Sequence, residues 1–423
     1  MNRGLLDRVL ARQIKRGQLK LTYPSGRTIA FGEPEPGFPQ VAVRFADEKV
    51  ARDIVFDPQL GAGETYMDGR LIVEDGGIME LLQLVQGNSP WEGQGGRMTA
   101  NLPHRIAQSI AFLWGQFNRP ASARRNVAHH YDIGNELYKL MLDPEHMQYS
   151  CAYWPREGMT LEQAQEAKLA HIAAKLGIEP GQSVLDIGCG WGGMALYLHQ
   201  TYGVEVLGIT LSDEQIATAK QRALDAGVAD KVRFELIDYR ELAGTYDRIV
   251  SVGMFEHVGT PQFETFFRTC ANLMTDDGVM LLHTIGRMGK PGLTDAFTDK
   301  YIFPGGYIPA LSETVEASEK MRLIATDIET LRLHYARTLR EWYRRCLEHR
   351  DEIVALFDER FFRLWTFYLS GSTAAFESGG LCNYQIQYAR NRHALPLTRG
   401  YIEDEERRLL GGGQAVAAER AIA

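Results

Sequence analysis

The sequence of 423 residues lacks the features of several large classes of protein. Its five cysteines are widely spaced and none forms a C-x-x-C pair, so neither a zinc site nor a disulfide framework is expected. We therefore expect no bound metal and a reducing, cytoplasmic location. The net charge is −8, from 46 Lys and Arg against 54 Asp and Glu, so the total charge predicts no binding to nucleic acid.

The sequence also has no apolar run long enough to span a bilayer. Basic residues interrupt the apolar pattern at the N-terminus, so no secretory signal is expected. A hydrophobic content of 45% and a charged content of 24% are typical of globular proteins. The length suggests two or three domains, as in an ordinary water-soluble enzyme.

A glycine-rich segment is the most informative feature that is present. Residues 184–193 read Val-Leu-Asp-Ile-Gly-Cys-Gly-Trp-Gly-Gly, after the start of an apolar run and before a helical pattern. Gly188 and Gly190 let the backbone approach a ligand without a Cβ. Asp186 falls at the end of the expected strand, where open α/β sheets bind ligands. An acid at this place favours a ligand with a cationic or hydroxyl-bearing group over a pyrophosphate. The segment resembles the first motif of class I S-adenosylmethionine (SAM) methyltransferases, and an ordinary turn between strand and helix is the alternative.

Strands alternate with helices from Asp132 onward, which predicts a doubly wound, mostly parallel α/β sheet. The expected strands are 183–187, 204–209, 232–236, 247–252 and 279–285, with an edge strand at 385–389. Helices are expected at 135–142, 161–176, 213–226, from Pro261 onward, at 339–350 and at 353–370. Ser212 is well placed to cap one of them.

Residues 1 to about 90 predict a small N-terminal α+β domain for membrane or dimer contact. An amphipathic helix is followed by β-like runs at 19–23, 28–31, 41–45, 54–56 and 71–73, and by a helix at 78–85. A stretch at 87–96 rich in Gly, Asn, Ser and Pro marks the boundary. We then expect a basic linker at 91–125, a catalytic domain at 126–410 with a helical cap insertion at about 287–370, and a flexible tail at 411–423.

Basic residues gather in two amphipathic stretches. Residues 1–30 carry seven Lys and Arg against one acid, and apolar residues from Leu5 to Ile14 lie at helical spacing. The span 97–131 has five Arg and no acid, with Trp114 and Phe117 on its apolar side. Such helices can lie on an anionic membrane. Packing of the same apolar faces inside the protein is the alternative.

The ends of the second and third strands offer further polar groups. The segment Gly208-Ile-Thr-Leu-Ser has no acid for ribose hydroxyls, so Thr210 and Gln215 would supply a hydroxyl and an amide. Asp238 is placed to accept a hydrogen bond from the adenine amino group. Tyr239 would cover the adenine ring, unless it is a core aromatic residue.

Further motifs make the resemblance specific. They are the segments 129–135 (His-His-Tyr-Asp-Ile-Gly-Asn), 147–154 (Met-Gln-Tyr-Ser-Cys-Ala-Tyr-Trp), 208–212, 254–259 (Met-Phe-Glu-His-Val-Gly), 282–286 (Leu-His-Thr-Ile-Gly) and 334–342 (His-Tyr-Ala-Arg-Thr-Leu-Arg-Glu-Trp). In this order, over most of residues 125–390, they resemble the signature of the cyclopropane-fatty-acyl-phospholipid synthases. The leading small domain and its basic linker are similar to the bacterial long form of that family.

The resemblance implies an enzyme that transfers the methylene carbon of SAM to a cis double bond of an unsaturated phospholipid acyl chain, forming a cyclopropane fatty acid. The cofactor-binding residues that it implies are Tyr149, Ser150, Asp186, Gly188, Gly190, Trp191, Gly192, Gly193, Thr210, Leu211, Gln215, Asp238, Tyr239 and Arg240. The family also holds a bicarbonate ion, which here implies Cys151, Glu256, His283, Tyr335 and the main chain of Ile285. Bicarbonate suits a reaction in which a base must remove a proton from the newly added methyl group beside a carbocation. Without the resemblance, Cys151 and His283 would be taken as structural.

One position departs from the family. Ser372 stands where many members have a late cysteine, and Cys382 does not align with it. A bicarbonate base does not need that cysteine. Two other functions remain open, namely SAM-dependent methylation of an unsaturated chain without ring closure, and non-catalytic lipid binding. The expected partners are phospholipid with unsaturated acyl chains and the anionic inner face of the membrane, and a homodimer is common in the family.

Overall fold

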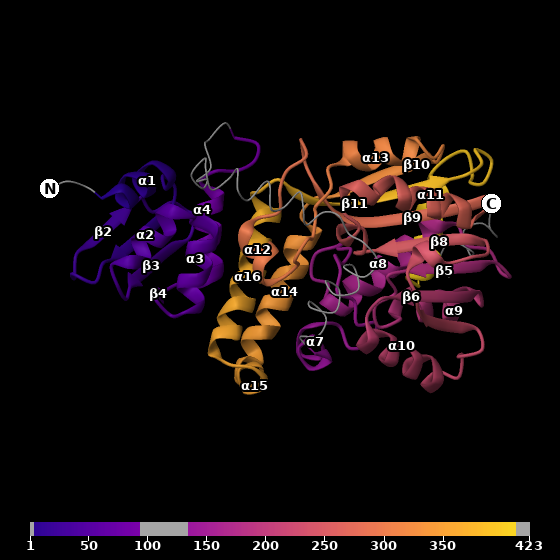
Figure 1. Ribbon diagram of the computed structural model, residues 1–423, viewed down its shortest axis with the longest axis horizontal. Coiled ribbons are helices and arrows are strands. Elements are labelled where there is room, and N and C mark those ends of the chain that lie inside the picture. The colour runs from indigo at the N-terminus through magenta and orange to yellow at the C-terminus, as the bar shows by residue number, and fades with distance from the viewer. Residues whose placement is uncertain (1–3, 94–133, 412–423) are drawn as a thin grey trace, which may run out of the picture. The chain divides into compact units, whose positions relative to one another are not determined.

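The computed structural model describes residues 4–93 and 134–411, which form two compact units (Figure 1). Unit 1 contains residues 4–93, 293–304 and 335–381, and unit 2 contains residues 134–292, 305–334 and 382–411. Most of the predicted linker, with its amphipathic stretch at 102–117, lies outside the described residues. So does the predicted tail beyond residue 411. Among the described helices, none has both the length and the apolarity that crossing a membrane requires.

The sheet of unit 2 has seven strands in the order β10-β11-β9-β8-β5-β6-β7. The strands are β5 (Ser183–Ile187), β6 (Glu205–Thr210), β7 (Val232–Leu236), β8 (Tyr246–Val252), β9 (Met274–Arg287), β10 (Ile324–Leu331) and β11 (Leu381–Ala389). The five strands β9, β8, β5, β6 and β7 run parallel to one another, and β10 pairs with β11 antiparallel. The predicted class, a mostly parallel α/β sheet, is confirmed.

One strand prediction is wrong in position. The expected edge strand at 385–389 is β11, which lies between β10 and β9 and is almost wholly buried. The edge is β10, which the sequence did not indicate. Most of β10 is exposed or half-buried, so the strand can carry the polar residues Thr326, Asp327 and Glu329. These residues interrupt the alternation of apolar and polar positions that would have indicated a strand.

Helices cover both sides of this sheet (Figure 1). They are α7 (Asn135–Met141), α8 (Leu161–Leu176), α9 (Gly193–Tyr202), α10 (Asp213–Asp225), α11 (Phe263–Leu273), α13 (Leu311–Glu319) and α17 (Gly400–Leu409). Ser212 caps α10 by accepting a hydrogen bond from the Gln215 N–H, as predicted. The 3-10 turn Thr260–Gln262 contains Pro261 and precedes α11. Apolar residues of α8, α9, α10 and β5–β8 form the core that fixes the strand ends.

Unit 1 is an α+β fold around a four-stranded sheet in the order β2-β1-β3-β4. Its strands are β1 (Gln18–Thr22), β2 (Thr28–Phe31), β3 (Gln40–Phe45) and β4 (Leu71–Asp75). Its helices are α1 (Leu5–Gln13), α2 (Lys49–Phe56), α3 (Pro58–Met67), α4 (Ile78–Gly87), α12 (Ala296–Tyr301), α14 (His334–Glu348), α15 (Arg350–Leu356) and α16 (Glu359–Glu377). The predicted β-like run at 54–56 is wrong, because these residues end the helix α2, and α3 was not expected.

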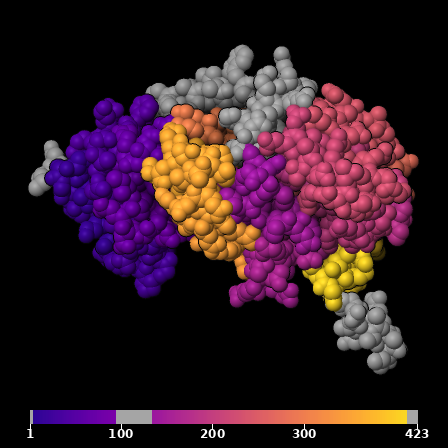
Figure 2. Space-filling view, turned by 90° about the horizontal axis from the view of Figure 1, so that it is seen from below, coloured from indigo at the N-terminus to yellow at the C-terminus, as the bar shows by residue number. Residues whose placement is uncertain are grey.

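Unit 1 gathers segments that are far apart in the sequence. Helix α16 packs on α3 and α4. In Figure 2 the orange segment accordingly lies against the indigo segment. The Gln83 amide donates to Glu377, and Arg360 pairs with Asp68. The helices that the sequence analysis placed in a cap insertion therefore pack with the N-terminal residues.

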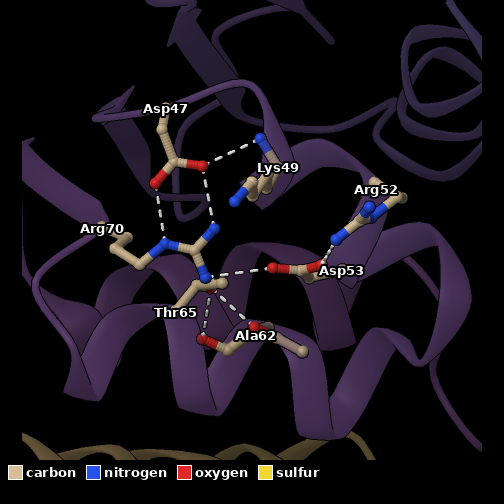
Figure 3. A network of polar contacts seen from close by, with 8 residues as sticks. Asp47, Lys49, Arg52, Asp53, Ala62, Thr65 and Arg70 are labelled. Atoms are coloured by element: carbon tan, nitrogen blue, oxygen red, sulfur yellow. Dashed lines mark hydrogen bonds and ion pairs between the residues drawn. The ribbon is translucent and has the colours of Figure 1, made fainter.

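A charged network fixes the start of β4 inside unit 1. The Arg70 guanidinium donates to both oxygens of Asp47, at 2.7 and 2.8 Å, and to Asp53 at 3.0 Å (Figure 3). This arrangement holds the pKa of Asp47 well below its usual range. Because Asp47 precedes α2 and Asp53 lies within it, Arg70 ties that helix to the sheet.

The apolar side of α1 is packed inside unit 1. Leu6, Leu10 and Ile14 are buried, and the buried Asp7 accepts hydrogen bonds from Tyr23 and Arg27. Of the apolar residues predicted to dock on a membrane, Leu5 alone is largely exposed, at 57%. The apolar face of the helix predicted to dock on a membrane therefore contributes to the protein core, which is the alternative of internal packing.

Candidate functional site

A cavity opens at the carboxyl ends of β5, β6, β7 and β8 in unit 2. It contains about 1090 Å³ of space free of atoms, part of it open to solvent. Ligands of open α/β sheets bind at this end of the strands. The predicted cofactor residues that line it are Tyr149, Ser150, Asp186, Gly188, Gly190, Trp191, Thr210, Leu211, Gln215, Asp238, Tyr239 and Arg240. Gly192 and Gly193 do not line it and instead begin α9.

The glycine turn between β5 and α9 requires residues without a side chain. Gly188 has a φ of +87°, and a Cβ there would lie 2.8 Å from the Cβ of Met254. A Cβ on Gly193 would lie 2.1 Å from the carbonyl oxygen of His146. Gly188 therefore keeps the floor of the cavity open, and Gly193 lets a second chain segment cross the start of the helix.

Asp186 is the buried acid at the end of β5. Its Oδ2 atom has no hydrogen-bond partner among the residues that the structure describes. Burial raises the pKa of Asp186 to about 7, and the positive charge of Lys168 opposes that rise. A buried carboxylate oxygen without a partner, in the wall of a cavity, fits a ligand that brings an ammonium or hydroxyl donor.

The next two strand ends carry polar side chains that are already paired. The Thr210 hydroxyl donates to the Gln215 side chain at 2.9 Å. Asp238 accepts hydrogen bonds from the backbone and guanidinium of Arg240, the shortest at 2.6 Å. Tyr239 packs edge-on against Phe266 and also lines the cavity, so its position is compatible with both interpretations of this residue.

The last wall of the cavity is the segment 147–150, which precedes α8. Met147 has a φ of +50°, which is uncommon for a residue with a side chain. Asp143 accepts hydrogen bonds from the backbone N–H groups of His146 (2.7 Å) and Gln148 (2.9 Å). The Tyr149 ring packs on Tyr138, with ring centres 5.0 Å apart. These contacts hold Tyr149 and Ser150 at the cavity.

Two residues of α8 support this wall from behind, and the sequence analysis missed both. The Gln165 amide donates to the carbonyl oxygens of Gln148 and Ser150, at 3.3 and 3.1 Å. The Lys168 ammonium donates to the Gln148 side chain and to the Ser150 hydroxyl, the latter at 3.0 Å. The sequence did carry a signal for them, because polar residues recur at 165, 168 and 175 on one side of an alanine-rich helix.

The residues predicted to hold bicarbonate do not line the cavity itself, and four of them belong to unit 2. Glu256 and Ile285 are in direct contact, since the Ile285 N–H donates to Glu256 Oε1 at 2.5 Å. His283 is buried and contacts the side-chain amide of Gln385 at 3.1 Å. The Cys151 thiol is fully buried and donates to the neighbouring carbonyl of Ala152 at 3.3 Å.

Burial sets the charge state of these groups. It raises the pKa of the Cys151 thiol and lowers the pKa of His283 well below its usual value, so both are neutral near pH 7. It raises the pKa of Glu256 to about 7, with the bond from Ile285 acting against the rise. Glu256 can therefore donate or accept a proton near neutral pH.

Tyr335 and Ser372 do not line the cavity. Tyr335 belongs to unit 1, where its ring packs against Trp342 and Phe376. Ser372 is half-buried within α16. His257 follows Glu256 and lines the cavity, with its pKa lowered to about 4 by burial. Within the described ranges, no group of three or more His, Cys, Asp or Glu residues is placed to hold a metal ion.

Comparison with known proteins identifies similar chains. The profile of the family described as mycolic acid cyclopropane synthetase matches residues 118–386. The chain is 36% identical, over 82% of its length and 87% of the other, to the cyclopropane-fatty-acyl-phospholipid synthase of Escherichia coli K12. It is 33% identical, over 90% of both lengths, to the tuberculostearic acid methyltransferase UfaA1 of Mycobacterium tuberculosis. A crystal structure of the mycolic acid cyclopropane synthase CmaA1 with SAH and CTAB matches at a TM-score of 0.60 and 34% identity, over 63% of this chain and 98% of the other.

Proposed function

The chain belongs to the mycolic acid cyclopropane synthetase family of SAM-dependent methyltransferases, and we propose that it converts unsaturated phospholipid acyl chains into cyclopropane fatty acids. In this reaction the methylene carbon of SAM adds across a cis double bond. The product is an acyl chain that carries a three-membered ring, together with S-adenosylhomocysteine (SAH) and a proton.

The observation that carries the proposal is the unpartnered Oδ2 atom of Asp186 in the cavity at the strand ends. Its carboxylate would bind the methionine ammonium of SAM. The paired side chains of Thr210 and Gln215 would face the ribose hydroxyls, and Tyr239 would cover the adenine. These groups orient the cofactor and exclude water from it, while SAM supplies the reactive methyl group.

The proton that the reaction releases must reach a base. We propose that Cys151, Glu256, His283, Tyr335 and the Ile285 main chain hold a bicarbonate ion, which would supply that base. The neutral Cys151 and His283 fit a bound anion because they can donate hydrogen bonds without needing a counterion. Glu256 fits if it holds a proton itself or accepts a hydrogen bond from the bicarbonate hydroxyl, and its pKa of about 7 allows both.

The proposed substrate lies in a membrane, so the protein must act at its surface. The phospholipid substrate is proposed because it is named for the relative from E. coli, which aligns with 82% of this chain. We propose a cytoplasmic protein that binds peripherally to the anionic inner face of the membrane and forms a homodimer.

Methylation without ring closure is the second candidate. It is favoured by the similarity to UfaA1, named a tuberculostearic acid methyltransferase, which extends over 90% of both chains. The presence of Cys151, Glu256, His283 and Tyr335 favours ring closure. The two candidates differ only in the fate of the carbon after its transfer.

Product analysis tests both. The purified protein is incubated with SAM and vesicles of monounsaturated phospholipid, and the acyl chains are analysed by mass spectrometry and NMR. The proposal predicts a mass gain of one CH₂ and the ring protons of a cyclopropane. A methyl or methylene branch without a ring would support the second candidate. No transfer of carbon from SAM would refute both.

A further inference from the structure

Helix α8 presents a row of polar side chains inside unit 2. Gln165, Lys168, His171 and Lys175 recur along one side of the helix and are all buried. A buried ammonium is costly unless it is hydrogen-bonded and compensated by negative charge. Lys175 meets this need with Glu329, at 2.5 Å. Lys168 is fully buried as well, but its surroundings are different.

The hydrogen bonds of Lys168 go to the wall of the cofactor cavity. Its ammonium donates to Gln148 and Ser150, and both acceptors are neutral. Gln148 and Ser150 line the cavity, whereas Lys168 stands behind them. Ser150 precedes Cys151, so the same hydrogen bonds also help to hold Cys151, a residue of the proposed bicarbonate site. Lys168 thus fixes the position of two residues of the cavity wall without lining the cavity itself.

The charge of Lys168 acts on the acids around it. Burial lowers the pKa of Lys168 to about 7, and the carboxylates of Asp143 and Asp186 counteract this. In return, the ammonium lowers the pKa of Asp186, which burial has raised. The other titratable groups that act on this pair are His146, Cys151, Cys189 and His283.

We propose that Lys168 is a positioning residue of the cofactor site, whose hydrogen bonds fix Gln148 and Ser150 in the cavity wall and whose ammonium provides positive charge near the carboxylate of Asp186. The proposal rests on the proposed function, since it takes the cavity to be the SAM site. Lys168 does not line the cavity, and the comparison with known proteins assigns it no role.

The test is SAH binding by calorimetry at several pH values from 6 to 9. SAH carries the same amino-acid and adenosine groups as SAM. Protonation of Asp186 removes the partner of the ligand ammonium, so affinity falls as the pH is lowered. Lys168→Met should weaken binding at pH 7 by about tenfold, because the cavity wall loses the two hydrogen bonds that hold Gln148 and Ser150. It should also move the pH midpoint of binding upward, because Asp186 loses the cation that favours its charged form.

Two variants of the same helix serve as controls. Gln165→Met removes hydrogen bonds from the same wall but no charge, so it should weaken binding without moving the pH midpoint. Lys175→Met also replaces a buried lysine of α8, but one that pairs with Glu329. It should lower thermal stability and leave the midpoint unchanged.

The outcomes separate the two proposals. If the parent protein does not bind SAH, the proposed function fails. If the parent binds SAH and Lys168→Met binds equally well with an unchanged midpoint, the role of Lys168 is refuted. Should Lys168→Met fail to fold, Lys168→Arg is measured in its place. Because arginine keeps its positive charge, the pH midpoint of SAH binding should stay at or below that of the parent. An upward shift of this midpoint refutes the proposal.

Discussion

The Oε1 atom of Glu256 accepts a 2.5 Å hydrogen bond from the backbone N–H of Ile285. This bond ties the 3-10 turn Phe255–His257, which follows β8, to the neighbouring strand β9. The other carboxyl oxygen, Oε2, is buried and has no hydrogen-bond partner in the described part of the chain. One half of this side chain is therefore committed to the fold, and the other half is free for a ligand.

The buried carboxyl of Glu256 should make stability depend on pH. Its pKa is 4.5 in an ordinary environment and is raised to about 7 by burial in the fold. The folded state thus holds this proton more tightly than the unfolded state does. The resulting stability is fully present below pH 4.5 and is lost as the pH rises to about 7. Glu256→Gln should avoid this loss and gain at most about 3 kcal/mol relative to the parent at high pH.

Thermal unfolding of the parent and of Glu256→Gln at pH 5 and pH 8 checks this expectation. The difference between the two proteins should favour the variant more at pH 8 than at pH 5. Arg70 and Asp47 lie in unit 1 and remain unchanged in both proteins, so their contribution cancels. A difference that is the same at both pH values would show that Glu256 has an ordinary pKa.

Bicarbonate should be needed for turnover but not for cofactor binding. We expect activity to fall in degassed, carbonate-free buffer and to recover when bicarbonate is added. His283→Ala and Tyr335→Phe should each slow turnover strongly and leave SAH affinity unchanged, because neither residue lines the cavity proposed for the cofactor. Near-normal rates in both variants would contradict the proposed bicarbonate site. A branched product in place of the ring would indicate that only ring closure had failed.

The glycine turn should be essential for cofactor binding. Gly188→Val places a branched side chain at a φ of +87°, within 2.8 Å of Met254, on the floor of the cavity. We expect SAH binding to be lost, together with about 1–3 kcal/mol of stability from backbone strain. Gly203→Val is the matched control, since Gly203 has a φ of +69° with open space around it. It should lose stability and keep its affinity. Unchanged SAH affinity in Gly188→Val would remove the cavity as the cofactor site.

The sequence predicted those parts of the fold and site that local patterns determine. Strand β5, its glycine turn and the N-cap Ser212 were located because an apolar run, a glycine cluster and a capping residue each act within a few residues. Strand β11 was expected at the edge of the sheet and β10 was not predicted, because strand order depends on contacts across the whole sheet. The role proposed for Lys168 was invisible for the same reason. A lysine is normally solvated, and only the packing of α8 on both sides shows that this one is buried.

Membrane docking through residues 102–117 and the arginines that follow is the last prediction, and it falls on residues outside those that the structure describes. The burial of Leu6, Leu10 and Ile14 leaves this stretch as the remaining basic amphipathic candidate. Attraction to an anionic leaflet contributes about 1 kcal/mol per basic residue near the surface. Replacing Trp114 and Phe117 with Ser, or Arg119, Arg124 and Arg125 with Glu, should therefore weaken flotation with anionic vesicles. Activity on vesicles should fall with it, high salt should mimic the charge reversal, and substrate dispersed in detergent should be affected much less. Arg52→Glu is the control, because this exposed arginine lies on α2 in unit 1 and its reversal should not change flotation. If the tryptophan and arginine variants float as well as the parent, the membrane contact lies elsewhere on the protein.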